Sequence, residues 1–383
     1  MGARATGTKT IIATLLAIVI VFAVIRCEPV LGGEAKPAWQ AEWEKVLQAA
    51  KGEGQVIFYG ASRYENLFAE FHKRFPEIKV VAVTSGLPPD LAQRLMAERR
   101  AGKYLADLYI AGASTMHRVL YKGNALDPIK PALILPEVVD ESKWWMAGKY
   151  NYADEEGKHI FAFNGEIQPY FAYNSKLVNP DEFKSYWDLL NPKWKGKMAV
   201  LDPAVGGPVA TPLRLLYHTP GLGPEYLKRL LTEMDLVASR DPFQIVNWLA
   251  AGKYAISLFT AANRSNIPEA KKQGLPVDWF PPKSFKEGVI LSSASGNVGL
   301  VNQAPHPNAA RVAINWLLSR EGQILYQRIE PEQDSLRIDI AKDDVPEYSR
   351  RVDGVNYVAT ERPEWMDMKP IQQLVNEVWQ KRK

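Results

Sequence analysis

Between residues 55 and 86 the chain reads QVIFYGASRYENLFAEFHKRFPEIKVVAVTSG. The apolar run at residues 55–59 is typical of a short buried strand, and a loop of small residues follows it. Apolar residues then recur at helical spacing, which predicts a helix over residues 64–75 that Pro76 ends. Residues 78–83 form the next apolar run. A strand, a small-residue loop, a helix and a second strand together form the repeating unit of an α/β fold.

The same alternation continues along the rest of the chain. Further strands are expected at residues 107–110, 160–163, 170–173, 198–201, 236–238, 254–259, 277–280 and 297–301. Further helices are expected at residues 39–50, 91–102, 183–190, 242–250, 307–318, 321–329 and 371–379. Because strands and helices alternate in two sets, we expect two lobes, each built on a doubly wound parallel sheet. Residues 166–174 are expected to form a strand that crosses from one lobe to the other.

The N-terminus has the pattern of an export signal. Arg4 and Lys9 precede an apolar run at residues 11–25, which is shorter than the about 20 residues needed to cross a bilayer. Gly33 and Ala35 are small residues suited to a cleavage site after residue 35. We therefore expect residues 1–35 to be a signal peptide and the mature chain to be periplasmic. An uncleaved membrane anchor is the alternative.

Composition excludes several classes of function. The net charge is +4, with 47 basic and 43 acidic residues, which is too mild to indicate a nucleic-acid partner. Cys27 is the only cysteine and lies in the signal, so the mature chain has no cysteine nucleophile and no thiolate metal ligand. No short-spaced histidine pair and no catalytic serine motif occur. We expect no cofactor and no enzymatic activity.

Five segments resemble, in order along the chain, the family 1 extracellular solute-binding proteins, especially the ferric-iron-type branch. They are WEKVLQAAKGEGQVIFYG (43–60), LFAEFHKRFPEIKV (67–80), LAQRLMAERRAGKYLADLYI (91–110), YWDLLNPKWKGKMAVLDP (186–203) and HPNAARVAINWLLSREGQ (306–323). The resemblance implies a type II periplasmic-binding fold, an α/β architecture of two lobes that close on a small-molecule ligand. It also implies an ABC permease in the inner membrane as partner, and we expect a monomer.

The expected division of the chain follows from the two alternating sets. Residues 36–165 form lobe one and residues 166–275 form lobe two. Residues 276–383 form a return segment with the C-terminal helices, and part of residues 275–340 goes back to lobe one.

The ligand of a doubly wound sheet lies beyond the carboxyl ends of its strands. The loops expected there hold Ser62, Arg63, Tyr64, Ser85 and Ser114 in lobe one, and Gly207, Arg240, Thr260 and Arg264 in lobe two. Free N–H groups at helix starts and planar guanidinium groups favour an anion such as a carboxylate, phosphonate or phosphate ester. The same residues also serve as ordinary caps and turns, and the arginines could be solvated surface groups.

Ferric iron is the alternative ligand. The resemblance to iron-binding relatives implies an adjacent pair of tyrosines after the strand at residues 254–259, but Phe259 is followed there by Thr260, Ala261 and Ala262. If iron binds, the ligands are expected among Tyr64, Tyr170 and Tyr173; otherwise no metal site is assigned. A ligand sensor or an enzyme on the same fold is the third alternative.

Overall fold

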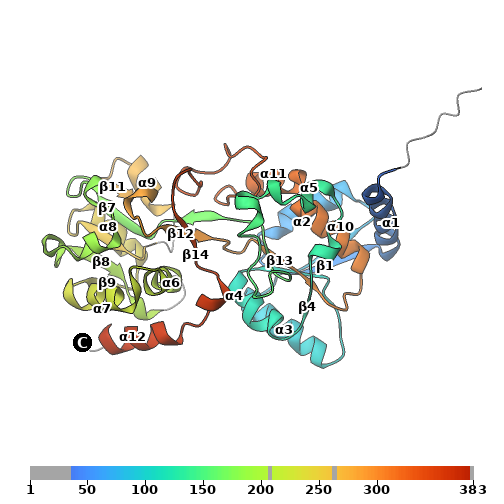
Figure 1. Ribbon diagram of the computed structural model, residues 1–383, viewed down its shortest axis with the longest axis horizontal. Coiled ribbons are helices and arrows are strands. Elements are labelled where there is room, and N and C mark those ends of the chain that lie inside the picture. Colours follow the sequence, from blue (N-terminus) through green and yellow to red (C-terminus); the bar gives the residue numbers. More distant parts are fainter. Residues whose placement is uncertain (1–35, 206–208, 261–264, 380–383) are drawn as a thin grey trace, which may run out of the picture. The chain divides into compact units, whose positions relative to one another are not determined.

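The computed structural model describes residues 36–205, 209–260 and 265–379 (Figure 1). The expected signal peptide and the predicted site residues Gly207 and Arg264 lie outside these ranges. No helix in the described ranges is both long and apolar enough to span a membrane.

The first sheet has the strand order β2-β1-β3-β13-β4, and β5 also pairs with β13. Its strands are β1 (Gln55–Gly60), β2 (Lys79–Val83), β3 (Leu108–Ala111), β4 (Leu126–Asp127), β5 (Phe161–Ala162) and β13 (Asn297–Val301). The strands β1, β2 and β3 are parallel, as predicted. β13 runs antiparallel to β3, so this sheet is mixed, whereas a parallel sheet was predicted.

The second sheet has the order β11-β7-β10-β8-β9. Its strands are β7 (Phe171–Asn174), β8 (Met198–Leu201), β9 (Val237–Ser239), β10 (Ile256–Leu258) and β11 (Val277–Trp279). β8 pairs in parallel with β9 and β10, whereas β7 is antiparallel to β10 and β11. This sheet is therefore mixed as well.

A third, small sheet contains β6 (Glu166–Gln168), β12 (Val289–Ser292) and β14 (Tyr357–Ala359) in the order β14-β12-β6. The single crossing strand expected at residues 166–174 is thus two strands in different sheets. Pro169 separates them because it has no N–H for a ladder hydrogen bond. β12 and β14 were not predicted from the sequence.

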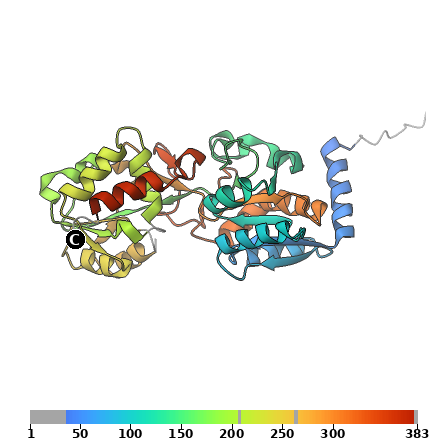
Figure 2. The ribbon, with the colours of Figure 1, turned by 90° about the horizontal axis from the view of Figure 1, so that it is seen from below.

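Helices cover both larger sheets (Figures 1 and 2). The longer ones are α1 (Ala38–Glu53), α2 (Tyr64–Arg74), α3 (Pro88–Arg100), α6 (Ala210–His218), α7 (Gly223–Glu233), α8 (Pro242–Ala250), α9 (Asn266–Lys272), α10 (Pro307–Leu318), α11 (Arg320–Ile329) and α12 (Lys369–Trp379). Two short helices, α4 (Ala113–Thr115) and α5 (Pro136–Val139), belong to loops. The helix expected at 183–190 is instead a 3₁₀ turn, Tyr186–Leu190, which Ser185 and Asp188 start with a reciprocal cap.

Each larger sheet has its own apolar core. One joins α1, α2 and α10 to β1 and β3 through residues such as Phe68, Phe71 and Trp316. Another surrounds β8 and β10 with α6 and α7, and α12 packs on this group (Figure 2).

The polar segment after Pro331 is held by buried charges. Asp334 is fully buried, and its Oδ1 lies 2.9 Å from Lys342 Nζ and 3.3 Å from Arg351 Nη2. Arg337 is also fully buried and forms a two-pronged ion pair with Asp339 at 2.8 and 2.7 Å. These contacts hold in place a segment that is largely polar in sequence.

Candidate functional site

The carboxyl ends of β1, β2 and β3 meet at one edge of the first sheet, because these strands are parallel and Gly60 is in register with Ile110. A Cβ atom at Gly60 would lie 2.0 Å from the Ile110 carbonyl oxygen, so only glycine fits this close approach. The loops carrying Ser62, Ser85 and Ser114 all start from this edge. The structure therefore brings these three predicted loops together.

The side chains in these loops differ in what they contact. Ser62 and Ser85 are exposed. Arg63, also exposed, lies 3.5 Å from Glu330 in an ion pair. Ser114 Oγ contacts Met366 Sδ at 3.2 Å, which joins the β3 loop to the C-terminal segment.

Tyr64 lies in the core of the first lobe. It is fully buried, its hydroxyl donates to the Ser295 carbonyl at 2.9 Å, and its ring stacks on Tyr326. Burial raises the pKa of Tyr64 well above its usual value of 10.0, although the hydrogen bond to Ser295 opposes the shift. The protonated phenol is therefore strongly favoured in this conformation, and a phenolate ligand would need a different environment.

The second sheet also presents parallel carboxyl ends at one edge, from β8, β9 and β10. Arg240 follows β9, and its Nε lies 3.2 Å from Asp202 Oδ2, which follows β8. Asp202 also accepts a hydrogen bond from Trp379 Nε1 at 3.0 Å. Burial alone would raise the pKa of Asp202, but these donors and the Ala204 N–H outweigh it and lower the pKa. Thr260 is buried, with its hydroxyl 3.4 Å from the Tyr170 carbonyl.

The two tyrosines of the iron alternative have separate surroundings. Tyr170 is 6% exposed and donates its hydroxyl to Gln168 Oε1 at 2.5 Å. Tyr173 is 7% exposed and packs on Phe280, and burial raises its pKa. Within the described residues, no group of three or more histidine, cysteine, aspartate or glutamate side chains could hold a metal ion.

A cavity of about 470 Å³ joins the two sheet edges; we call it the Arg214 cavity. Ser114 and Arg118 line it from the β3 side, Ala204 from the end of β8, and Arg214 from α6. The C-terminal segment and α12 contribute Met366, Met368, Ile371, Gln372, Val375 and Asn376, and the remaining lining residues are Pro203, Val209, Ala210 and Leu213. No acidic side chain occurs among the described residues of this lining.

Arg118 and Arg214 were both absent from the site residues predicted from the sequence, and Arg214 is the buried one of the two. It is 8% exposed; Nη1 donates to the Thr360 carbonyl at 3.1 Å, and Nε has no hydrogen-bond partner among the described residues. Burial lowers the pKa of its guanidinium, the neighbouring Arg118 lowers it further, and Glu361 opposes both. A lone arginine within the apolar run of α6 is the sequence signal that could have identified it.

The model of the bacterial extracellular solute-binding protein family matches residues 58–324. FutA from Trichodesmium, solved with iron and citrate ligands, is similar in structure, with TM-score 0.64 and 18% identity over 85% of this chain and 99% of that chain. Ferric iron-binding protein A of Mannheimia haemolytica in an open conformation has TM-score 0.64 and 15% identity over 85% and 98%. The Bordetella ferric binding protein has TM-score 0.63 and 20% identity over 85% and 98%.

These similarities confirm the type II periplasmic-binding fold, with the mixed sheets described above. The matched family consists of solute-binding proteins rather than enzymes, with a small-molecule ligand and an ABC permease as partner. Because the family model covers most of the chain, this protein is a member of the bacterial extracellular solute-binding protein family, the periplasmic receptors of ABC importers.

Proposed function

We propose that this receptor carries a small organic anion, such as a carboxylate, phosphonate or phosphate ester, and binds it in the Arg214 cavity. In this proposal residues 1–35 are removed on export, and lobes at residues 36–165 and 166–275 close on the anion. Residues 276–383 return to complete both lobes.

The observation that carries this proposal is the charge of the cavity. Arg118 and Arg214 both line it, they repel each other, and no described lining residue is acidic. A buried guanidinium binds a carboxylate or phosphate through a planar pair of donors, and low dielectric surroundings strengthen that interaction. An anion in this cavity would relieve the repulsion between the two arginines.

The position of the cavity supports the same conclusion. Ser114 follows β3 and Ala204 follows β8, so the lining includes the carboxyl ends of both parallel sets of strands. This is where ligands bind in open α/β sheets. Ser114 is thus the residue of the predicted set that this proposal retains in direct contact with the ligand. Arg63 and Arg240 each already pair with a carboxylate, so this proposal gives them no direct contact with the bound anion and places them on its path into the cavity.

Ferric iron is the second candidate, and the names of the similar structures favour it over an organic anion. In this chain the candidate phenolates would come from Tyr64, Tyr170 and Tyr173. Their hydroxyls lie in separate, buried environments, so iron binding would require these side chains to rearrange.

A thermal-shift panel separates the two candidates. The mature chain is tested with di- and tricarboxylates, phosphonates, phosphate esters and ferric iron supplied as the citrate complex, with iron-free citrate as the matched control. A ligand present at 100 times its Kd stabilises the folded state by about 2.7 kcal/mol. Stabilisation by an iron-free organic anion is the expected result. Stabilisation only by the ferric complex, with a tyrosinate colour that is lost in Tyr64→Phe or Tyr170→Phe, would instead support iron.

A further inference from the structure

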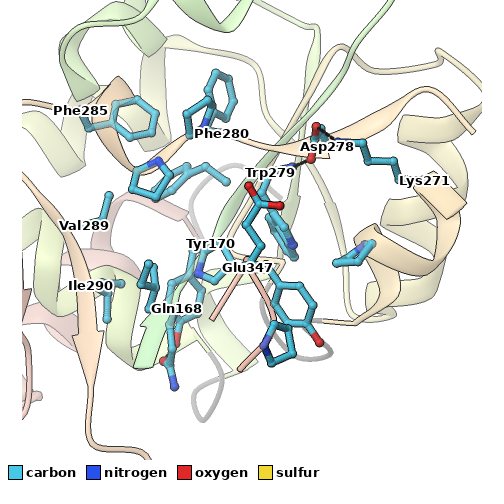
Figure 3. Close-up of a pocket in the computed structure, with 18 of the residues that line it drawn as sticks. Gln168, Tyr170, Lys271, Asp278, Trp279, Phe280, Phe285, Val289, Ile290 and Glu347 are labelled. Atoms are coloured by element: carbon cyan, nitrogen blue, oxygen red, sulfur yellow. Dashed lines mark hydrogen bonds and ion pairs between the residues drawn. The ribbon is translucent and has the colours of Figure 1, made fainter. Parts of the chain in front are cut away.

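A second cavity, of about 630 Å³, shares none of its lining residues with the Arg214 cavity (Figure 3). We call it the aromatic cavity. Its walls come from β7 and β11, from α9, and from the C-terminal segment around Glu347. Aromatic side chains form much of the lining, among them Tyr170, Phe171, Trp279, Phe280, Phe285 and Tyr348. A volume of this size is typical of a small-molecule site.

One wall consists of aromatic rings that pack on one another. Tyr186 and Phe285 stack with ring centroids 4.1 Å apart and an angle of 8° between their planes. Phe280 packs against Phe285 at 5.4 Å. Because these rings support one another, they offer a preformed surface on which a flat molecule can stack.

The charged side chains of this cavity lie at its rim, and their positive and negative charges are equal in number. Lys271 pairs with Asp278 at 2.6 Å, and Lys272 and Glu347 are exposed. Unlike the Arg214 cavity, this lining therefore has no excess of one charge, which favours an uncharged occupant.

Trp279 supplies a specific polar group. It is 8% exposed, and its indole Nε1 has no hydrogen-bond partner among the described residues. A buried N–H without an acceptor costs free energy, which an acceptor atom of an occupant would recover. Neighbouring atoms cover Nε1, so presenting it to an occupant requires a rotation of the indole ring.

We propose that the aromatic cavity is a second binding site, for an uncharged, flat aromatic or heteroaromatic molecule whose acceptor atom bonds to Trp279 Nε1. The aromatic wall provides stacking, and the indole N–H selects molecules with an acceptor. This inference does not depend on which solute the Arg214 cavity carries.

Quinoline and naphthalene are suitable probes, because they have the same shape and only quinoline has an acceptor nitrogen. Both are titrated into the mature chain at pH 7.5, where quinoline is uncharged, and the indole N–H signals are followed by NMR. The Trp279 signal is assigned by its absence in Trp279→Phe. We expect a shift of this signal, with quinoline bound about threefold to tenfold more tightly than naphthalene.

Three variants test the site. Trp279→Phe keeps an aromatic ring and is expected to bring the two affinities together. Val289→Phe fills part of the cavity and is expected to weaken both probes, with a thermal melt to check folding. Arg118→Gln, in the other cavity, is the control and is expected to change neither. Equal affinities for the two probes in the wild-type chain, an unshifted Trp279 signal, or full binding by Val289→Phe would overturn the proposal.

Discussion

Asp334→Asn tests whether buried charge holds the C-terminal segment in place. The carboxylate of Asp334 is fully buried and faces two cations, Lys342 at 2.9 Å and Arg351 at 3.3 Å. Its Oδ2 also accepts the Arg351 backbone N–H at 3.1 Å. Asparagine has nearly the same size but no charge, so the substitution leaves Arg351, whose side chain is 7% exposed, and Lys342, whose side chain is 21% exposed, without their anion.

The expected cost is about 3–5 kcal/mol, the usual result of removing one partner from a buried ion pair. For a chain of 383 residues, an unfolding entropy of about 2.1 cal/mol/K per residue converts this to a fall in Tm of about 4–6 °C. The assay is urea unfolding followed by circular dichroism, with a calorimetric melt beside it. Lys342→Met is combined with Asp334→Asn in a double-mutant cycle.

If the ion pair is responsible, the double variant loses less stability than the sum of the two single variants. Pro346 and Tyr348 lie between Lys342 and Arg351 and line the aromatic cavity, so Asp334→Asn should also weaken quinoline binding. A loss below about 1 kcal/mol, with additive single effects, would refute the reasoning, because exposed pairs behave that way.

Three further predictions concern stability. Burial lowers the pKa of Lys342 from 10.5 to about 8 despite the opposing charge of Asp334, so between these two pH values the unfolded chain binds more protons than the folded chain. The free energy of unfolding should therefore rise by up to about 3 kcal/mol from pH 8 to 10.5, and Lys342→Met should lack this rise. Gly60→Ala should cost about 3 kcal/mol or more in urea unfolding because its Cβ would strike a carbonyl oxygen, whereas Gly52→Ala, whose Cβ would meet nothing within 4 Å, should cost nothing. Equal losses of stability in the two variants would contradict this reasoning. Asn315→Leu should cost about 3 kcal/mol, since Asn315 is fully buried and accepts the N–H groups of Ile134 and Leu135; a neutral result would mean that these groups find other partners.

The alternation of apolar runs and helical spacing was enough to predict β1, α2, β2 and β3, because local pattern determines these elements. It could not predict the direction of β13, which depends on where a distant segment re-enters the sheet. It also could not reveal β12 and β14, whose pairing partners lie far away in the sequence.

The candidate site shows the same limit at the level of side chains. The helical spacing of Tyr64 with Leu67, Phe68 and Phe71 already indicates that Tyr64 belongs to the buried face. Arg240 has an acidic neighbour in the sequence, yet it pairs with Asp202 from another strand. Arg214 becomes a site candidate only when α6, α12 and the β3 loop are seen to surround one cavity.

The central claim is that Arg118 and Arg214 bind an organic anion. Its most direct test is calorimetric titration of the best anion from the panel into the wild-type chain, Arg214→Gln, Arg118→Gln and the exposed control Arg100→Gln, each checked for folding. We predict that Arg214→Gln binds the anion about 10- to 150-fold more weakly, as expected for loss of a charged hydrogen bond. Arg118→Gln should also bind the anion more weakly, and the affinity of Arg100→Gln should be unchanged. Unchanged affinity in both Arg214→Gln and Arg118→Gln would place the solute elsewhere and contradict the account.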